Sequence, residues 1–460
     1  MKKKVAFNCA VFVLFLILPG PAQDRATTLT RAEIAQAVDK VCQLLNRFYV
    51  LPEVATRMER HIRAKLEAGT FDRMTDSDEF LEAMTRELRS VCHDKHLAMF
   101  KGANPDERSK EERDLDRFAG QFESKRRNFG LDKVEILGGN VGYLRIRSVM
   151  YSREAMEVVS AALKFLENTD ALIIDLRENR GGDPAYMASV LSYFFEKPTH
   201  INSIYWKDRD RTDEFWTKES VPGKKLVDLP LYVLVSGQTF SGAEEFAYDL
   251  QALKRAVVIG EKSAGGANPA SSWVVYKDLR ISIPYGRAIN PTTGTNWEGV
   301  GVKPDIETGA DKALEAAVAV AEPAAEDRRA KMMENLLAAY NECSSSLKQA
   351  EMLFLQKKTE EAETLVLSIL KRAIERKVMD QSSINQKGYE LLRQESRAMA
   401  IAVFKCNAQA YPGSANVYDS LGEAYLANGD IQLAIDSYRR ALALEPGLES
   451  AKRALEKIRK

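Results

Sequence analysis

A serine stands where a buried strand is expected to turn into a helix. The apolar run 231–235 predicts the strand, the run 243–254 predicts the helix, and Ser241 lies between them. The first backbone N–H groups of a helix have no partners within the helix, so they can face an oxyanion. Ser241 is therefore a candidate nucleophile. With Glu244 it also has the S-x-x-E spacing of a capping box, which needs no chemistry.

A serine nucleophile needs a base, usually an oriented histidine, and the chain has only four histidines. His61 lies in an amphipathic helical pattern, and His200 lies at the start of an expected strand. His93 and His96 lie where the N-terminal helices end. A third group must hold the imidazole tautomer. Glu298 is a candidate because its glycine-rich surroundings predict a tight loop, although an ordinary surface carboxylate would look the same.

A glycine pair follows another expected strand. The loop 175–184 contains Gly181 and Gly182 and ends with Pro184 at a helix start. Glycines permit unusual dihedral angles and leave N–H groups free, which suits an oxyanion hole or an edge that binds an extended peptide. A plain turn would have the same composition. The G-x-x-x-x-G-K-[ST] pattern of a phosphate-binding loop is absent from the sequence.

The elements that must position these residues fall into three regions. Residues 28–100 have apolar side chains at helical spacing and predict a helical N-terminal domain. The charged stretch 102–125 predicts an exposed connection or a partly ordered helix. In residues 125–308, short β-branched runs alternate with helical patterns, which predicts an α/β core with a largely parallel sheet. The expected strands are 141–146, 171–174, 231–235 and 257–259, the expected helices are 154–167, 184–196 and 243–254, and a hairpin is expected over 273–283.

Residues 326–460 predict a third, all-α region that contains an internal repeat. Two segments, 34 positions apart, fit the tetratricopeptide pattern; they are marked by Ile384, Gly388, Leu391, Ala400, Phe404 and Pro412, and by Tyr418, Leu421, Gly422, Tyr425, Ala434, Tyr438, Ala441 and Pro446. A degenerate helical pair is expected before them, near 353–370, and a polar capping helix after them, over 449–460. The alanine-rich stretch 319–331 is expected to be the connector. Such repeats present a concave face to a protein partner or pack on the core.

Composition and the N-terminus bear on location. The 66 basic residues balance the 66 acidic ones, so no global field favours nucleic acid or a membrane surface. Residues 1–22 predict a signal peptide, because lysines 2–4 precede the apolar run 5–18 and small residues follow. An uncleaved anchor is the alternative. We therefore expect an exported, periplasmic or extracellular protein with no stable membrane span after signal cleavage.

The cysteines predict no metal or redox site. Cys42, Cys92, Cys343 and Cys406 remain after processing, and none forms a C-x-x-C motif. An exported location would permit a Cys42–Cys92 disulfide, but four buried thiols are the favoured reading. No metal or cofactor is expected.

The middle of the chain resembles the S41 serine peptidases, the tail-specific protease family. It is most similar to the branch that includes interphotoreceptor retinoid-binding protein and the tricorn protease core. The resemblance spans roughly residues 30–308 and rests on the segments 128–130, 134–137, 139–144, 175–182, 239–245, 299–301 and 304–305. It implies a multidomain protein with a ClpP/crotonase-like α/β core behind a helical N-terminal domain.

The resemblance also implies a catalytic triad. Ser241 matches the nucleophile, His96 in the stretch Asp94-Lys95-His96-Leu97 matches the general base, and Glu298 matches the acid that orients it. These three residues would hydrolyse a peptide bond in a peptide or protein substrate.

The resemblance places the oxyanion hole on the N–H group of Gly242 and on that of Gly181 or Gly182. The C-terminal-processing branch uses a Ser–Lys dyad instead, but Gly266 stands where its lysine would be. Lys262 is a turn's length away and is not expected to replace it. No segment has room for a PDZ domain, so recognition of a substrate's C-terminal tail is not implied.

The sequence therefore predicts an exported serine peptidase whose repeats serve protein interaction. One alternative is a catalytically inactive, peptidase-derived module that binds apolar ligands or peptides. In another, the repeats carry the main function and the core is a scaffold. Reaction with a serine-directed fluorophosphonate would separate these readings.

Overall fold

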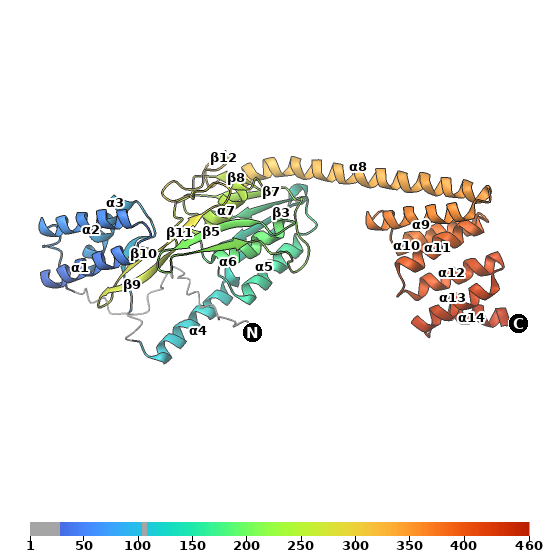
Figure 1. Cartoon of the computed structure of the whole chain (residues 1–460), viewed down its shortest axis with the longest axis horizontal. Coiled ribbons are helices and arrows are strands. Elements are labelled where there is room, and N and C mark those ends of the chain that lie inside the picture. The colour runs from blue at the N-terminus through green and yellow to red at the C-terminus, as the bar shows by residue number, and fades with distance from the viewer. Residues whose placement is uncertain (1–27, 104–107, 149, 460) are drawn as a thin grey trace. The chain divides into compact units, whose positions relative to one another are not determined.

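The computed structural model describes residues 28–103, 108–148 and 150–459, and divides them into two compact units at Asp327/Arg328 (Figure 1). Each unit is described by itself below. The signal peptide expected over residues 1–22 lies outside the described residues. Within the described ranges, no helix combines the length and the apolar character that crossing a membrane requires.

Three helices open the first unit, as the sequence predicts. They are α1 (Arg31–Phe48), α2 (Pro52–Glu67) and α3 (Ser77–Cys92). α1 starts at a capping box made by Thr30 and Glu33, and α2 starts with a proline, which needs no N–H donor there. Each helix buries one apolar face in a shared core.

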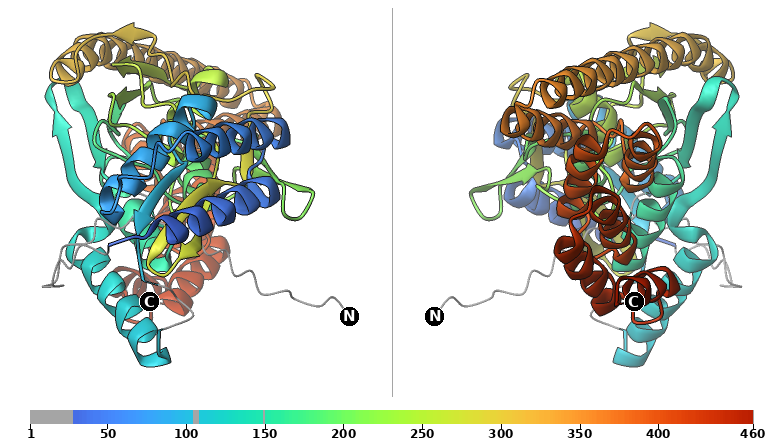
Figure 2. Two further views of the ribbon diagram at one scale, coloured as in Figure 1. Left: turned by 90° about the vertical axis from the view of Figure 1, so that its left-hand side faces the viewer. Right: turned by 90° about the vertical axis from the view of Figure 1, so that its right-hand side faces the viewer.

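A small antiparallel sheet closes this helical core, and its strands come from distant parts of the chain. β1 (Ala98–Lys101) pairs with β10 (Leu279–Pro284), which pairs with β9 (Ala270–Tyr276). The hairpin β9–β10 confirms the predicted turn, and its inner face packs on the helices (Figure 2). The prediction that the helical region extends to about residue 100 is wrong for its last residues. α3 ends at His93 (φ 58°), and the chain then pairs as a strand with β10.

The central sheet confirms the largely parallel α/β core. Its order is β12-β8-β7-β4-β3-β2, and only β2 runs antiparallel to its neighbour. The strands are β2 (Leu131–Leu137), β3 (Val141–Ile146), β4 (Ala171–Asp175), β7 (Leu231–Val235), β8 (Val257–Gly260) and β12 (Ile306–Glu307).

Alternating side chains cover both faces of this sheet. Residues such as Leu144 and Val233 face α5 (Arg153–Phe165), α6 (Pro184–Leu191) and α7 (Gly242–Ala252). Tyr143, Ile173 and Leu234 face the first turns of α8 (Ala313–Leu355), which buries alanines 313, 317, 321 and 325. The stretch 319–331, expected to be a connector, is thus continuous helix, and its first half packs on the sheet.

Several elements of the first unit have weaker sequence signals. β5 (His200–Trp206), β6 (Arg211–Trp216) and β11 (Gly286–Ile289) form a third sheet, and α4 (Lys110–Arg126) buries none of its residues. Short 3-10 turns lie at Asn128–Gly130, Gly138–Asn140 and Ser192–Phe194. The helix α4 falls in the charged stretch for which the sequence left a connection or a helix open.

The second unit is all helical and shows the repeat as physical contacts. After α8 it contains α9 (Thr359–Glu375), α10 (Gln381–Arg393), α11 (Arg397–Ala410), α12 (Ala415–Asn428), α13 (Ile431–Leu444) and α14 (Glu449–Arg459). A Cβ atom on Gly388 would lie 2.4 Å from the Phe404 ring, and one on Gly422 would lie 2.8 Å from the Tyr438 ring. The same glycine–aromatic contact therefore recurs at the 34-residue offset.

Candidate active site

Ser241 lies on a strained turn between β7 and α7. Its dihedral angles are φ 54° and ψ −126°, a conformation that a non-glycine residue adopts at a cost of about 1–3 kcal/mol. We call residues 236–242 the nucleophile turn. Buried Thr239 fixes it, because its hydroxyl accepts from Ser236 N at 2.9 Å and donates to Leu176 O at 2.9 Å. Strain held this firmly at a strand-to-helix turn is typical of a positioned nucleophile.

Glu244, on the first turn of α7, is a buried residue whose importance the sequence does not reveal. One carboxylate oxygen accepts from Ser241 N at 2.9 Å and from Gly266 N at 2.8 Å, and the other accepts from Ser263 Oγ at 2.5 Å and from Gly265 N at 2.6 Å. Burial raises the pKa of this carboxyl and outweighs these hydrogen bonds. The S-x-x-E spacing predicts only the bond to Ser241. The others pin residues 263–268, the facing loop, against the nucleophile turn.

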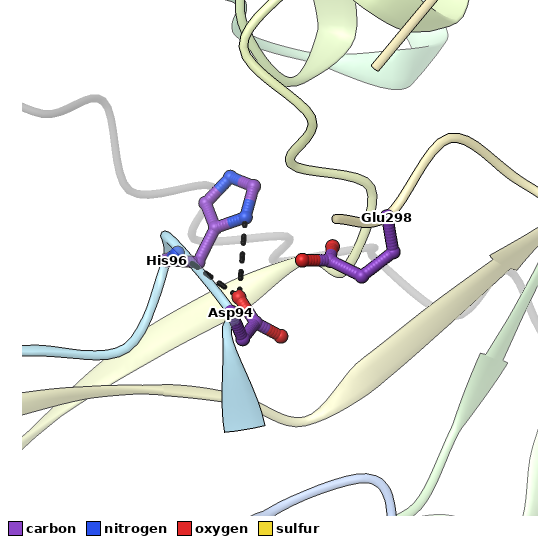
Figure 3. A group of neighbouring side chains, drawn as sticks. All are labelled: Asp94, His96 and Glu298. Atoms are coloured by element: carbon purple, nitrogen blue, oxygen red, sulfur yellow. Dashed lines mark hydrogen bonds and ion pairs between the residues drawn. The ribbon is translucent and has the colours of Figure 1, made fainter. Parts of the chain in front are cut away.

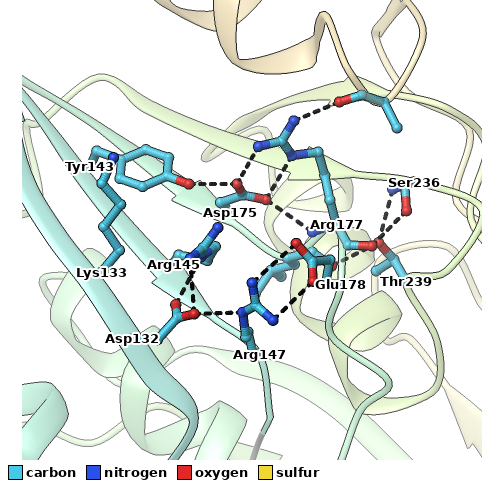
Figure 4. A network of polar contacts seen from close by, with 12 residues as sticks. Asp132, Lys133, Tyr143, Arg145, Arg147, Asp175, Arg177, Glu178, Ser236 and Thr239 are labelled. Carbon is cyan, nitrogen blue, oxygen red and sulfur yellow. Dashed lines mark hydrogen bonds and ion pairs between the residues drawn. The ribbon is translucent and has the colours of Figure 1, made fainter.

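We call the loop 175–184 the glycine loop. Its first residues are anchored at the end of β4. Asp175 is buried and binds the Arg177 guanidinium through both carboxylate oxygens, at 3.0 and 2.6 Å, while the Tyr143 hydroxyl donates to it at 2.6 Å (Figure 4). Burial pushes the pKa of Asp175 up, but the bonds from Arg177 and Tyr143 bring it below its ordinary value. Arg177 also donates to Ala310 O at 2.5 Å.

The tip of the glycine loop touches the nucleophile turn. Gly181 has φ 95°, and a Cβ atom there would lie 2.7 Å from both Ser241 Cβ and Gly242 N. Buried Asn179 joins the two segments, since its carbonyl accepts from Phe240 N at 3.1 Å and its side chain accepts from Gly181 N at 2.8 Å. Gly181 must therefore lack a side chain for the two backbones to meet beside Ser241.

His96 belongs to the helical N-terminal domain, but its side chain lies against the nucleophile turn. Arg89 holds the segment after α3 by donating to Lys95 O at 2.6 Å and to Leu97 O at 2.8 Å. Lys95 Nζ donates to Ala264 O in the facing loop at 2.5 Å. The His96 ring then packs on Phe240, the residue before Ser241, with ring centroids 4.4 Å apart.

The His96 imidazole is suited to act as a base at neutral pH. Burial, and then the charge of Arg89, lower its pKa to about 4, so the ring is neutral. Within the described part of the chain, the structure shows no hydrogen bond between Ser241 Oγ and this ring. Such bonds are often long or misaligned before substrate binds.

The remaining histidines lie elsewhere. His61 pairs with Glu87 at 2.8 Å in the helical N-terminal domain. His200 contacts Ser203 Oγ at 2.9 Å and stacks on Trp216 in the sheet of β5, β6 and β11. His93 is exposed and ends α3. Of the four, only His96 contacts the nucleophile turn in the described structure.

Gly266 has no side chain, and the His96 ring lies in the space that a side chain would fill. A Cβ atom on Gly266 would lie 2.2 Å from the Phe240 ring and 2.9 Å from His96 Cε1. A lysine at this position has no space beside these rings, and Lys262 is exposed. The geometry therefore favours histidine over lysine as the partner of Ser241.

Gly266→Ala should lower turnover by roughly 100-fold, because it displaces His96 from Ser241, and a misplacement of about 1 Å can cost that much. The control is Gly413→Ala, which lies outside the site and whose Cβ atom would meet nothing within 4 Å. Peptide hydrolysis and melting temperature should be measured for both. Equal turnover in the two variants would show that the His96 position is not critical.

Two carboxyl groups, not one, lie behind the His96 ring (Figure 3). Glu298 accepts from Ala267 N at 2.6 Å and from Asn268 N at 3.1 Å through one oxygen, and its other oxygen is buried without a hydrogen-bond partner in the described structure. Asp94 Oδ1 accepts from His96 N at 3.0 Å and lies 3.9 Å from His96 Nδ1. The sequence singled out Glu298 and used Asp94 only as part of a motif.

Burial changes the pKa of both carboxyl groups. It raises the pKa of Asp94 to about 6, and burial together with the charge of Asp94 raises that of Glu298 to about 8. One atom each from Asp94, His96 and Glu298 lie within 4.8 Å of one another, which is close enough to hold a metal ion. No other such group occurs among the described residues.

Cys92 lies beside this site, because its Sγ atom accepts a hydrogen bond from Asp94 N at 3.4 Å. All four described cysteines are free; Cys42, Cys343 and Cys406 are buried, and Cys92 is half-buried. The Cys42–Cys92 disulfide that the sequence permitted is thus not formed, and the expectation of four buried thiols holds for three of them.

Comparison with known proteins identifies the regions of the chain. Residues 140–308 match the model of peptidase family S41, residues 23–128 match the N-terminal domain of Peptidase_S41 in eukaryotic IRBP, and residues 415–448 match a tetratricopeptide repeat. The earlier repeat, expected at Ile384 to Pro412, rests on the recurring contact described above.

Relatives share a limited part of the chain. The carboxy-terminal-processing protease of Bartonella bacilliformis is 27% identical over 174 residues, which cover 36% of this chain and 38% of that protein. The carboxyl-terminal-processing protease of a Synechocystis species is 35% identical over 130 residues, covering 28% and 29%. The tricorn protease structure is 14% identical, covers 65% of this chain and 37% of that chain, and gives a TM-score of 0.43.

The family models agree with the architecture described above. The helical domain that supplies His96 falls in the N-terminal match, and the sheet that supplies Ser241 falls in the peptidase match. Residues 140–308 therefore match a peptidase family S41 domain, with a match to the N-terminal domain of that family before it and a tetratricopeptide repeat after it.

Proposed function

We propose that the protein is an exported serine peptidase that hydrolyses peptide bonds with Ser241 and His96. The strained Ser241 at the start of α7, with His96 packed against the preceding residue, carries this proposal. Neutral His96 takes the proton of Ser241 Oγ as the oxygen attacks the scissile carbonyl. The imidazolium, stabilised by the carboxyl groups behind it, then protonates the leaving amine, and water releases the acyl group.

Two backbone N–H groups can stabilise the oxyanion of this reaction. Gly242 N begins α7, where helix N–H groups lack intrahelical partners. The glycine loop supplies the second donor, and the structure favours Gly182 for it. Gly181 N already donates to Asn179 at 2.8 Å, whereas a Cβ atom on Gly242 would lie 3.2 Å from Gly182 N.

The substrate class follows from this chemistry, and the compartment from the sequence. The relatives are named carboxyl-terminal-processing proteases, and for this chain we propose only a peptide or protein substrate. We propose export to a periplasmic or extracellular space because residues 1–22 have the pattern of a signal peptide. The repeats would recruit a protein partner.

Hydrolysis of a mixture of internally quenched peptides tests the proposal. The mature protein should cleave some of them, and a fluorophosphonate should stop the cleavage. Binding of peptides without cleavage under any condition would instead support the inactive, peptidase-derived binding module.

The repeats should be removable without loss of chemistry. A protein ending at Asp327 keeps Ala325, the last buried alanine on the sheet, and loses only the second unit. It should remain folded and hydrolyse short peptides, while losing partner or large-substrate recruitment.

The matched control ends at Lys312 and removes all four sheet-covering alanines. It should unfold or aggregate, because one sheet face becomes exposed. Loss of short-peptide turnover by the protein ending at Asp327 would refute a separable repeat unit. Circular dichroism and the peptide assay report both outcomes.

A further inference from the structure

The carboxyl groups behind His96 raise a question about the site proposed above. In a Ser-His-acid triad, one carboxylate at Nδ1 of the histidine fixes its tautomer and stabilises the imidazolium. Asp94 and Glu298 both lie there, and we call them the carboxylate pair (Figure 3). Two ionised carboxylates in one buried site repel each other, so such pairs share a proton. The question is which of them carries the charge.

We propose that Asp94 carries the negative charge that positions His96, and that Glu298 is the protonated member of the carboxylate pair. This inference rests on the proposed function, because it assigns roles around the same Ser241 and His96.

Geometry is the first reason for this assignment. Asp94 Oδ1 lies 3.9 Å from His96 Nδ1, and Nδ1 is buried with no hydrogen-bond partner in the described structure. A small rotation of the ring would close this distance. Asp94 also accepts from His96 N at 3.0 Å, so the carboxylate holds the backbone of the base and lies next to its ring.

The hydrogen-bond donors around the pair are the second reason. Both oxygens of Asp94 accept hydrogen bonds, one from His96 N and the other from the Asn268 side chain at 3.0 Å, which is how a buried carboxylate is kept ionised. Both donors to Glu298 go to a single oxygen, and the other oxygen is free to carry a proton. Figure 3 shows the Glu298 carboxyl group pointing toward the space between Asp94 and the ring.

Titration of the pair supports the same order. The pKa of Asp94, about 6, lies below that of Glu298, about 8, so Asp94 ionises first as the pH rises. The titratable groups that face the pair are Tyr49, Arg89, Cys92, His96 and Glu244. Among them only Arg89 is a permanent cation, and its charge favours the ionised form of Asp94.

The test compares Asp94→Asn with Glu298→Gln at pH 7. Asparagine keeps an oxygen that can accept from His96 N but removes the charge, whereas glutamine resembles a protonated Glu298. Asp94→Asn should lower kcat by roughly 100-fold or more with little change in KM, because loss of a triad carboxylate leaves the base wrongly oriented. Glu298→Gln should lower kcat by less than about tenfold, since it mimics the protonated form that neutral pH favours.

The pH profile and a third variant separate charge from structure. In the wild type, kcat/KM should fall below about pH 6 as Asp94 becomes protonated, and Asp94→Asn should remove that limb. Asp94→Ala removes both the charge and the side-chain oxygen that accepts from His96 N. If the charge is the important property, the turnover of Asp94→Ala should be as low as that of Asp94→Asn. If asparagine restores nearly full activity while alanine does not, Asp94 has only a structural role and the inference is wrong.

Comparing the loss of kcat in Asp94→Asn with that in Glu298→Gln shows which carboxyl group is the charged partner of His96. A larger loss in Glu298→Gln than in Asp94→Asn would make Glu298 the charged partner and overturn the assignment. Unchanged melting temperatures would exclude unfolding as the cause of either loss.

Ser241→Ala and His96→Ala should be measured in the same assay. If both stay active, the proposed function fails; if both are inactive while Asp94→Asn matches the wild type, only this inference fails.

Discussion

Ser241→Ala is expected to lower kcat by roughly 10⁶-fold while the protein remains folded, because loss of a triad serine removes the nucleophile itself. The substitution should not lower the melting temperature. Alanine keeps the backbone N–H that donates to Glu244 at 2.9 Å, so the main anchor of the turn is retained. Initial rates of peptide hydrolysis and a thermal melt should be measured on the same preparation.

The matched control for this prediction is Ser220→Ala, which changes an exposed serine outside the site. It should hydrolyse peptides at the wild-type rate. Substantial turnover in Ser241→Ala would mean that a different group attacks the substrate, and the role of the nucleophile turn would then be structural.

His96→Ala should reduce kcat to a similar extent, since removal of a triad histidine alone can cost about as much as removal of all three residues. The physical reason is that Ser241 would keep its proton: no other histidine contacts the nucleophile turn in the described residues, and Lys262 is exposed. His93→Asn is the control, because asparagine tolerates the left-handed conformation that His93 adopts at the end of α3.

Lys262→Ala completes this comparison. It should leave most of the turnover, whereas a Ser–Lys mechanism predicts that it abolishes turnover and that His96→Ala does not. A large loss in His93→Asn with an active His96→Ala would move the base to His93. Steady-state rates for the three variants decide among these possibilities.

The main elements of the fold were predictable because their signals are local. Apolar β-branched runs gave the buried strands β3, β4, β7 and β8, and helical spacing gave α1 to α3. The sheet of β5, β6 and β11 was only partly predictable. A strand was expected to start at His200, but β6 buries none of its residues, and β11 pairs with β5 about 80 positions earlier in the chain. The helix α4 has no buried residue, so its pattern could not distinguish it from a connection.

The repeats were predictable for a different reason. Their signal is the same glycine and aromatic positions found twice, and the contacts of Gly388 with Phe404 and of Gly422 with Tyr438 give those positions a common cause. A recurring local contact needs no knowledge of the rest of the fold.

The candidate site was only partly predictable. Ser241 and the glycine loop have local signals, namely a strand-to-helix turn and a glycine pair. The choice of His96 and Glu298 depended on family resemblance, because their proximity is created by tertiary structure. Glu244 and Asp94 were missed as site residues since their partners, such as Gly266 and Asn268, lie 22 and 174 positions away.

The central claim is that the fold activates Ser241 as a nucleophile. Treating the mature protein with a fluorophosphonate at neutral pH and locating the adduct by mass spectrometry tests it most directly. We expect a single adduct, on the peptide that contains Ser241, and no adduct under the same conditions in His96→Ala. A stable, folded protein that is not labelled, or that carries the adduct on another residue, would contradict the claim.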